Sequence, residues 1–348
     1  MFHLVNAATG DEAYRTAGAF FATGGIARDQ MSRLGRTLEV PRVAISIADP
    51  RQRYVFSRSP AINPAFAIAE VVWILTGRDD SAFLNFFNRS LPKFSGSTSN
   101  YHGAYGKRLR HTFGVDQLVR SAEVLRTSKE SRQVVLQIWD ATTDLPTEFG
   151  IPSSCDIPCN VSSMLKIRDN RLEWTQILRS NDLFRGLPYN FVQFMAMQEI
   201  LSGWIGVEPG CYCHLSDSLH VYASDQANLS LSESAGDIPT PMSFNLGYED
   251  SMESLSRIAD HIDDLLEQPQ EPIDFVKRID SSKLPCCYRN MLCVLYAEAA
   301  RRLHEAEQVE RIMRRCECEA LSQLMQRWLA RMQPTFESPM TAEEAAST

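Results

Sequence analysis

Reactive and polar side chains are concentrated near the middle of the chain. A thiol follows a proline at Cys159, a guanidinium and a hydroxyl stand together at Arg179 and Ser180, and a carboxylate and an amide follow at Asp182 and Asn190. A thiolate can attack a ring carbon, an arginine fork matches phosphate oxygens, and an amide offers both a donor and an acceptor. These groups could together hold, recognise and attack a pyrimidine nucleotide.

The residues between the thiol and the guanidinium predict a hairpin that would position both. Alternating apolar residues continue to Ile167, a turn follows at Asp169-Asn170, and a second alternating run ends at Leu178. A hairpin places the outer ends of its strands side by side, so Cys159 should lie near Arg179. A cation there favours the thiolate form.

A second candidate for chemistry is Glu70. Residues 64 to 75 predict a helix with a wide apolar face, which stops at Gly77. Because burying an unpaired carboxylate is costly, Glu70 is either paired, reactive, or turned to solvent between two apolar stripes. The helix pattern alone leaves these readings open.

Other elements follow from hydrophobic periodicity and turn residues. Helices are predicted over residues 10–30, 83–87, 116–127 and 191–204, and strands over 43–47, 54–56, 134–139 and 210–222. Towards the C-terminus, one amphipathic helix is predicted around 255–266 and one or two more over 287–332.

Composition restricts the class of protein. The chain has 348 residues, of which 44% are apolar and 22% charged, and its formal net charge of -8 argues against a nucleic-acid-binding face. The sequence shows no secretory leader and no run of roughly 18 apolar residues, so we expect a cytosolic protein without a membrane span. The nine cysteines are spaced too tightly for common zinc sites, and we expect no metal.

Several motifs occur in an order that resembles the thymidylate synthase superfamily, which includes the deoxypyrimidine-nucleotide hydroxymethylases. They are Arg33-Leu34-Gly35, Glu70-Val71-Val72-Trp73, Tyr105-Gly106-Lys107, Ser131-Arg132, Pro158-Cys159, Leu178-Arg179-Ser180-Asn181-Asp182, Gly186-Leu187-Pro188-Tyr189-Asn190 and Leu219-His220-Val221-Tyr222. Each motif is weak alone, but their shared order is specific, and the resemblance covers about residues 15 to 225.

The resemblance implies an α+β fold in which a mixed β-sheet is flanked by helices and two sheets pack across a homodimer interface. Residues 1–245 would form the catalytic domain and 246–335 a helical C-terminal extension that does not match the family. Residues 336–348 are small and acidic and are expected to be a disordered tail.

The resemblance also implies an activity, the transfer of a one-carbon unit from 5,10-methylenetetrahydrofolate to C5 of a pyrimidine nucleoside monophosphate. Cys159 would add to C6, which makes C5 nucleophilic. Cys155 is a competing thiol, but it lacks the preceding proline. Glu70 would act as general acid or base, with Tyr105 and His220 supporting proton removal at C5.

Binding roles are implied in the same way. The phosphate would be held by Arg33, Arg179 and Ser180, together with Arg132 donated by the partner subunit. The base edge would be read by Asn190, and the sugar 3'-hydroxyl by His220 and Tyr222. The folate would be held by Glu70, Phe94, Asp182 and Gly186, with Asp182 also counted among the catalytic groups.

Departures from the family pattern favour a hydroxymethyl product over a methyl product. Asn160 stands where thymidylate synthases usually have histidine, and Phe94 stands about where a tryptophan usually shields the intermediate. A loosened shield would admit water. Reductive methylation of dUMP is the alternative reaction, and a nucleotide-binding protein without catalysis is the alternative class. Asn190 points to uracil, although an amide can be turned to pair with cytosine.

Overall fold

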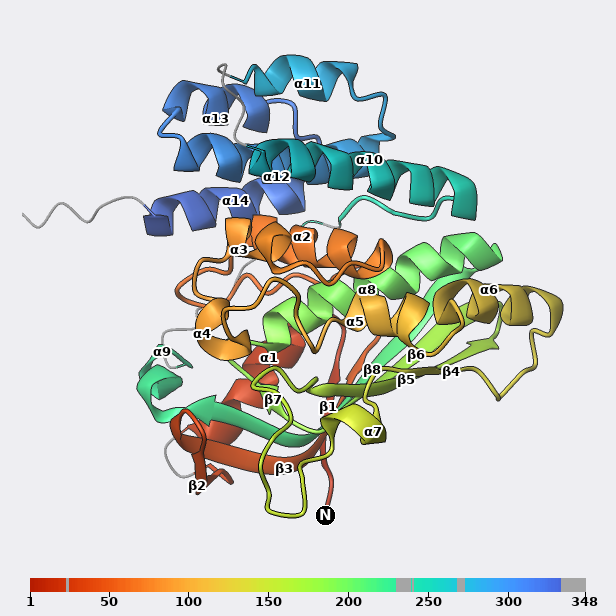
Figure 1. Ribbon diagram of the computed structural model, residues 1–348, viewed down its shortest axis with the longest axis vertical. Coiled ribbons are helices and arrows are strands. Elements are labelled where there is room, and N and C mark those ends of the chain that lie inside the picture. Colours follow the sequence, from red (N-terminus) through yellow and green to blue (C-terminus); the bar gives the residue numbers. More distant parts are fainter. Residues whose placement is uncertain (23–24, 230–238, 240, 268–272, 333–348) are drawn as a thin grey trace, which may run out of the picture.

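A mixed β-sheet forms the centre of the computed structural model, which describes residues 1–22, 25–229, 239, 241–267 and 273–332. Its main path runs β1-β3-β8-β6-β5-β4, while β2 pairs with β3 and β7 pairs with β8 (Figure 1). The strands are β1 (His3–Ala7), β2 (Arg28–Ser32), β3 (Gly35–Ile47), β4 (Val135–Gln137), β5 (Asn160–Arg168), β6 (Arg171–Leu178), β7 (Asn181–Asp182) and β8 (Glu208–Tyr222).

Helices account for most of the remaining described chain. They are α1 (Gly10–Gly18), α2 (Pro64–Leu75), α3 (Ser81–Phe87), α4 (Pro92–Ser95), α5 (Tyr105–Lys107), α6 (Gln117–Thr127), α7 (Ala141–Asp144), α8 (Leu187–Ile205), α9 (Gln226–Leu229), α10 (Tyr248–Leu266), α11 (Phe275–Ser281), α12 (Cys286–Arg302), α13 (Ala306–Met313) and α14 (Glu319–Met332). A π-helical turn covers Arg108–Thr112, and 3-10 turns cover Ala19–Phe21 and Ala223–Asp225.

Two buried helices, α2 and α8, cover one face of the sheet and carry much of the core. α8 contacts β6 and β8 directly, and α2 contacts α8 (Figure 1). Asn63 caps α2 by accepting hydrogen bonds from the Ala65 and Phe66 backbone N–H groups, and Gly77, at φ +75°, follows its end. Every residue of α2 except Glu70 is buried, as expected for a helix packed on both sides.

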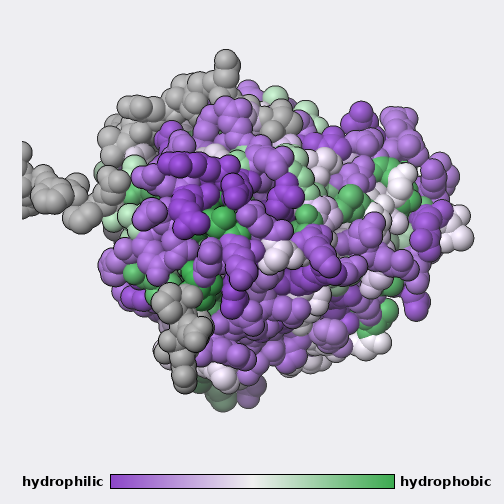
Figure 2. Space-filling model, turned by 90° about the horizontal axis from the view of Figure 1, so that it is seen from above, coloured by the Kyte–Doolittle hydropathy of each residue, from purple (hydrophilic) through white to green (hydrophobic). Residues whose placement is uncertain are grey.

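The five C-terminal helices form a further layer over α2. α10, α12 and α14 all contact α2, and α10 also contacts α3 and α8. Figure 1 shows this layer on the side of α2 away from the sheet. Its outer face is mostly hydrophilic, with only scattered apolar side chains (Figure 2).

No helix among the described residues covers the opposite face of the sheet. This open sheet face, defined by Ala44, Ser46, Met164, Thr175, Ile177, Cys211, Cys213 and Leu215, alternates along each strand with residues that are buried against the helices. Met164 is 37% exposed, and Leu4, which pairs with Ala44, is 69% exposed. An apolar sheet face of this kind is typical of an interaction surface.

Several elements confirm the sequence prediction, and others correct it. The helices at α2, α3, α6 and α8 and the hairpin β5–β6 lie where they were predicted, and Asp169 and Asn170 both have positive φ at the hairpin turn. The helix predicted over 10–30 is wrong beyond Gly18, because the chain turns and then forms β2.

The strand predicted over 54–56 is also wrong. This segment is buried but irregular. Arg53, just before it, pairs with Glu199 on α8, and the segment does not pair with a neighbouring strand. Three helices, α12, α13 and α14, occupy the range 287–332 instead of the predicted one or two, and α11 precedes them. The division of the chain at residue 246 stays a prediction, and residues 336–348 lie outside the described residues.

The described part of the chain contains no helix both long enough and apolar enough to cross a bilayer.

A buried ion pair anchors the segment that leads into α2. Arg53 and Glu199 are both fully buried, and Arg53 Nη2 contacts Glu199 Oε2. Arg51 Nε contacts the other carboxylate oxygen at 3.0 Å, and Ser243 Oγ donates to the same oxygen at 2.9 Å. Burial raises the pKa of Glu199, but Arg53 and these hydrogen bonds outweigh it and hold the pKa below its ordinary value.

Removal of this carboxylate should be strongly destabilising. Glu199→Ala leaves the Arg53 charge buried without a partner, which costs about 3–5 kcal/mol of unfolding free energy. Urea denaturation of the full chain measures the change. The exposed pair of Arg36 and Asp29 is the control, because Arg36→Ala should leave the urea midpoint unchanged. Equal midpoints for Glu199→Ala and the wild type would contradict this account.

Candidate active site

The β5–β6 hairpin brings Cys159 and Arg179 together, as predicted. The Arg179 backbone N–H donates to the Cys159 carbonyl oxygen at 3.0 Å. The Arg179 guanidinium donates to the carbonyl oxygens of Pro158 and Ile157 at 2.9 and 3.0 Å. The guanidinium is therefore fixed along the chain that immediately precedes the thiol.

The Cys159 thiol is subject to opposing electrostatic effects. Burial raises its pKa, and the carboxylates of Asp156 and Asp182 raise it further, while the cations of Arg179 and Arg33 lower it. The net pKa lies above the ordinary thiol value. The free protein therefore keeps Cys159 mainly as a thiol at neutral pH, and the two arginines limit the cost of forming the thiolate.

Two neighbouring loops fix the backbone before the thiol. Asp156 Oδ2 accepts a hydrogen bond from the Gly103 N–H at 2.8 Å. A Cβ at Gly103 would lie 2.8 Å from the Asp156 carbonyl oxygen, so only glycine fits this contact. Next to this contact, the buried carboxylate of Asp144 pairs with Arg108 and accepts a hydrogen bond from His102 Nε2 at 2.7 Å.

Glu70, on α2 and near Gln193 of α8, is half-buried instead of turned fully to solvent. Its Oε2 is buried and has no hydrogen-bond partner among the described residues. Burial raises its pKa to about 8, with a smaller opposing effect from Gln193 on α8. The carboxyl group is therefore largely protonated at neutral pH and can serve as an acid.

Tyr105, at the start of α5, belongs to the same cluster. Burial raises its pKa, and Cys159, Asp156 and Glu70 add to this effect, while the amide of Asn160 opposes it. Tyr105 therefore remains a neutral hydroxyl at neutral pH. The sequence predictions for Cys159, Glu70 and Tyr105 fall at one place in the structure.

The turn before α8 presents Asp182. Its Oδ1 accepts hydrogen bonds from the backbone N–H groups of Phe184 and Arg185, both at 2.8 Å. β7 pairs Asp182 with His220 on β8. Burial raises the pKa of Asp182 and lowers that of His220, and each group partly offsets the shift of the other. A Cβ at Gly186 would lie 3.2 Å from the Asp182 carbonyl oxygen.

Asn190 is held by a buried polar network that sequence reasoning missed. Its Nδ2 donates to Asn181 Oδ1 at 3.1 Å. Asn181 Nδ2 lies 2.7 Å from His214 Nε2 and 3.2 Å from Ser216 Oγ. Burial lowers the pKa of His214 to about 3, so the imidazole is neutral. The sequence signal for this network was the presence of two polar residues, His214 and Ser216, on the buried face of a strand.

Arg33, Tyr222 and Phe94 lie at the rim of this site. In the turn between β2 and β3, the Arg33 guanidinium donates to the carbonyl oxygens of Cys155 and Phe94 at 3.1 and 3.3 Å. Arg185, which sequence reasoning did not single out, lies over the Tyr222 ring at 4.5 Å and the Phe94 ring at 5.7 Å. Ser180 is half-buried next to Arg179.

Arg132 is not brought to this site within one chain. It is exposed between α6 and β4, and β4 pairs Val135 with Met164. Arg132 therefore lies near the end of β5 that is farther from Cys159. Its assignment to the partner subunit stays a prediction.

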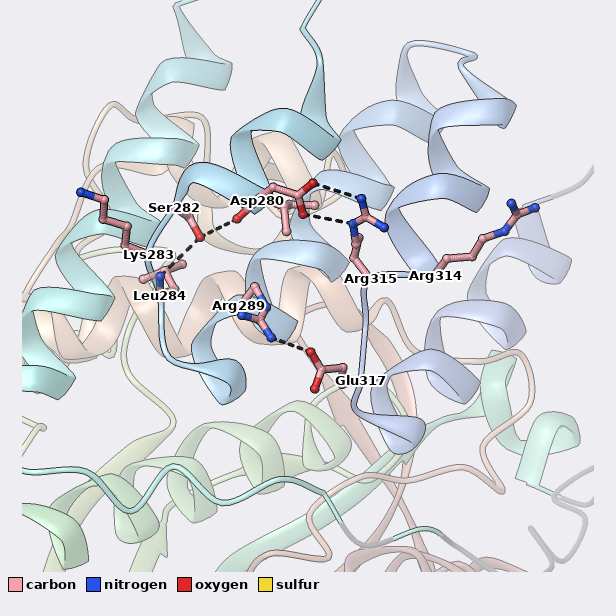
Figure 3. Close-up of a pocket in the computed structure, with 9 residues that line it drawn as sticks. Asp280, Ser282, Lys283, Leu284, Arg289, Arg314, Arg315 and Glu317 are labelled. Carbon is pink, nitrogen blue, oxygen red and sulfur yellow. Dashed lines mark hydrogen bonds and ion pairs between the residues drawn. The ribbon is translucent and has the colours of Figure 1, made fainter.

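A cavity of about 340 Å³ lies among the C-terminal helices. Figure 3 shows that Arg315 pairs with Asp280 and Arg289 with Glu317 there. Its lining residues belong to the segment 279–317 and include none of the predicted site residues. The described residues hold no cluster of three or more His, Cys, Asp or Glu side chains suited to a metal ion.

Comparison with known proteins matches residues 52–274 to the thymidylate synthase family model. The chain belongs to this family. The match includes Glu70, Tyr105, Cys159 and the hairpin, and it runs through α10, beyond the range covered by the motifs.

Named relatives include phage enzymes. The chain is 34% identical over 201 residues to the deoxyuridylate hydroxymethyltransferase of Bacillus phage SP01, covering 55% of this chain and 51% of the phage protein. It is 34% identical over 201 residues to that of Pseudomonas phage M6, covering 57% and 55%. A putative thymidylate synthase of Methanothermobacter marburgensis is 34% identical over 118 residues, 34% of this chain and 50% of that protein. The chain thus spans about half the length of these relatives.

The reactivity of Cys159 should follow its electrostatic surroundings. We expect alkylation by iodoacetamide to accelerate as pH rises through the raised pKa of this thiol. Arg179→Gln should slow alkylation of Cys159 at pH 8, because the pKa rises further once the nearby cation is removed. Arg179→Lys keeps the charge and should have the smaller effect.

Mass spectrometry of peptides after timed alkylation measures this reactivity. Exposed Cys155 in the same sample serves as the internal reference. Identical Cys159 rates in the wild type and in Arg179→Gln would contradict a role of Arg179 in thiolate formation.

Proposed function

We propose that the protein is a hydroxymethyltransferase that adds a one-carbon unit to C5 of a pyrimidine nucleoside monophosphate, with dUMP as the substrate. The observation that carries the proposal is the convergence of Cys159 and Arg179 with Glu70 and Tyr105 in one site. Similarity to phage proteins named deoxyuridylate hydroxymethyltransferase supports this reaction.

The phosphate would be bound by Arg33, Arg179 and Ser180. Each guanidinium donates to two backbone carbonyl groups and retains further N–H groups for a phosphate oxygen. Both arginines lower the pKa of Cys159. The same two positive charges would therefore bind the phosphate and favour the thiolate. His220 and Tyr222, adjacent on β8 with ring centroids 5.6 Å apart, would hold the sugar hydroxyl.

Base selection would depend on Asn190. Its Nδ2 already donates to Asn181, which leaves the Oδ1 acceptor for a ligand. Uracil carries a proton on N3, whereas N3 of cytosine is an acceptor. The orientation of the Asn190 amide therefore supports uracil.

Addition of the Cys159 thiolate to C6 would move the ring electrons toward C5 and O4. The protonated Glu70 could donate to O4 as this charge develops. C5 would then form its new carbon–carbon bond and lose its proton, and Tyr105 would take part in this proton transfer. Departure of the thiolate at the end would restore the aromatic ring.

The one-carbon unit would come from 5,10-methylenetetrahydrofolate when this cosubstrate is bound, and tetrahydrofolate would leave as the C5 proton is lost. Glu70, Phe94, Asp182 and Gly186 would hold it. Glu70 Oε2 is buried without a hydrogen-bond partner among the residues that the structure describes, which fits a polar ligand group. A Cβ at Gly186 would crowd the Asp182 carbonyl oxygen at 3.2 Å, so glycine keeps the close turn that positions Asp182.

Water would complete the reaction by adding to the exocyclic methylene group. Phe94 is smaller than tryptophan, and its ring lies beside the charged Arg185, so the rim is more polar than a fully apolar shield. Similarity to a putative thymidylate synthase keeps reductive methylation as the second candidate. A protein that only bound nucleotides would need neither Cys159 nor Glu70.

A homodimer would complete the site. The open sheet face is half-buried and largely apolar, and Arg132 is exposed away from its own Cys159. Packing of two such faces about a two-fold axis could bring Arg132 of one subunit to the phosphate site of the other. The described helices of the predicted extension 246–335, α10 to α14, would then act as a cap on α2.

The reaction can be tested with nucleotides labelled with tritium at C5. With methylenetetrahydrofolate, we expect tritium release from dUMP and a product heavier than thymidylate by one oxygen. Cys159→Ala should abolish release because no adduct can form, whereas Cys155→Ala should retain it. A thymidylate product would establish the methylation alternative, and no release from dUMP, dCMP, UMP or CMP would contradict an enzymatic role.

Mixed dimers test the shared site. Arg132→Ala and Cys159→Ala are each expected to be inactive alone. After unfolding and refolding together, hybrid dimers should contain one intact site, giving roughly a quarter of wild-type tritium release under random assortment. Light scattering checks the dimeric state. Lack of recovery in mixtures shown to contain hybrids would contradict donation of Arg132 across the interface.

A further inference from the structure

Two arginines from distant parts of the chain bind neighbouring carbonyl groups in the segment that leads into α2. Arg58 Nη1 donates to the Pro60 carbonyl oxygen. Arg331 Nη1, near the end of α14, donates to the Ala61 carbonyl oxygen at 2.6 Å. Because Pro60 and Ala61 are consecutive, the two guanidinium groups are held close together. The C-terminal helices therefore place a positive charge beside the start of α2.

Neither of these arginines forms an ion pair with a carboxylate among the residues that the structure describes. Arg58 is 6% exposed and donates to backbone carbonyl groups, including that of Phe184 at 2.7 Å. In contrast, Arg302 on α12 pairs with the buried carboxylate of Glu298. Cations that lie close together without an anion are unfavourable, so Arg58 and Arg331 suit a negatively charged ligand.

The two charges also act on each other. Burial lowers the pKa of Arg58, and the positive charge of Arg331 lowers it further, whereas Asp182 partly offsets the shift. An anion bound by both guanidinium groups would remove this repulsion.

The position of Arg331 is fixed by the packing of α14. Trp328, one turn earlier on the helix, is buried, and its Nε1 donates to Glu298 Oε2 at 2.8 Å. The Arg331 guanidinium lies over the Trp328 ring at 5.1 Å. α14 contacts α2 and is the helix of the C-terminal layer drawn next to it in Figure 1. The cation is therefore presented by a packed helix.

Arg58 connects this pair of arginines to the candidate active site. Its guanidinium lies over the Phe184 ring at 4.0 Å, and its Nε binds the Phe184 carbonyl oxygen. The Phe184 N–H in turn donates to Asp182 Oδ1 at 2.8 Å. Direct contacts therefore run from Asp182, which is proposed to hold the cosubstrate, to Arg58 and on to the segment bound by Arg331.

The chemistry of the proposed ligands identifies the anion. The nucleotide phosphate is already assigned to Arg33 and Arg179. The folate cosubstrate ends in a glutamate, to which further γ-linked glutamates can be attached, and each unit adds a carboxylate. The four residues proposed to hold the cosubstrate include no cation. A guanidinium group matches a carboxylate in shape and charge.

We propose that Arg331, from the C-terminal helices, and Arg58 form a site for the glutamate carboxylates of the folate cosubstrate. This inference rests on the proposed function. Arg58, buried beside Phe184, would meet the first glutamate, and the exposed Arg331 would meet the units attached beyond it. α14 lies outside the residues matched to the family, 52–274. This part of the chain would therefore contribute to ligand binding as well as covering α2.

The number of glutamates on the ligand tests the proposal. Tetrahydrofolate and its triglutamate are titrated into the full chain in the presence of dUMP, and calorimetry measures each Kd. Arg331→Gln should raise the Kd of the triglutamate roughly threefold to tenfold, the scale of one ion pair at an exposed position. The Kd of the monoglutamate should change by less than about twofold. High salt should reduce the difference because it screens exposed charges.

Arg314→Gln is the matched control. Arg314 is an exposed arginine of the same helical layer, but it pairs with Glu310 and makes no contact with the segment bound by Arg331. Its replacement should leave both Kd values at the wild-type level. Arg58→Gln should weaken binding of both ligands, because Arg58 is assigned to the first glutamate. If thermal unfolding shows that Arg58→Gln does not fold, the exposed Arg331→Gln variant decides.

Tritium release by the wild type separates this inference from the proposed function. Its absence with dUMP, dCMP, UMP and CMP would contradict the proposed function itself. With release established, an unchanged triglutamate Kd in Arg331→Gln would overturn the assignment of Arg331. An equal loss in Arg314→Gln, or an equal loss for the monoglutamate, would overturn it too.

Discussion

The site depends on one main-chain constraint, the pairing of the two hairpin ends through the Arg179 N–H and the Cys159 carbonyl oxygen. It fixes a buried thiol and a permanent cation to the same short length of backbone. Burial of the thiol raises its pKa, while the Arg179 cation, which lowers that pKa, is held beside it. α2 and α8 build the rest of the site around this fixed point.

Elements whose side chains repeat with a clear local period could be predicted from the sequence. The hairpin β5–β6, α2 and α8 all combine such a pattern with a turn or capping residue, and their ends decide where Cys159, Arg179 and Asn190 lie. The resemblance to the family supplied the roles of these residues, which periodicity cannot provide. The placement of Arg132 depends on a second chain and stays a prediction.

Features that depend on distant partners could not be predicted. Residues 54–56 have the composition of a strand, but the Arg53–Glu199 pair holds the segment against α8, so tertiary contacts override local preference. The contacts of Asn181 with His214 and of Asn160 with Gln176 join different strands. Alternation shows that these polar residues face inward, but it cannot show which atoms meet.

The enclosure of α2 between two layers limits how this protein can diverge. A helix on a protein surface usually has one side on which substitutions are nearly neutral, and α2 has none, because every residue except Glu70 is buried. Size-matched apolar exchanges are the main changes it can accept. Substitutions should therefore accumulate in β2 and on the outer C-terminal helices, while α2 changes slowly even at positions remote from the candidate active site.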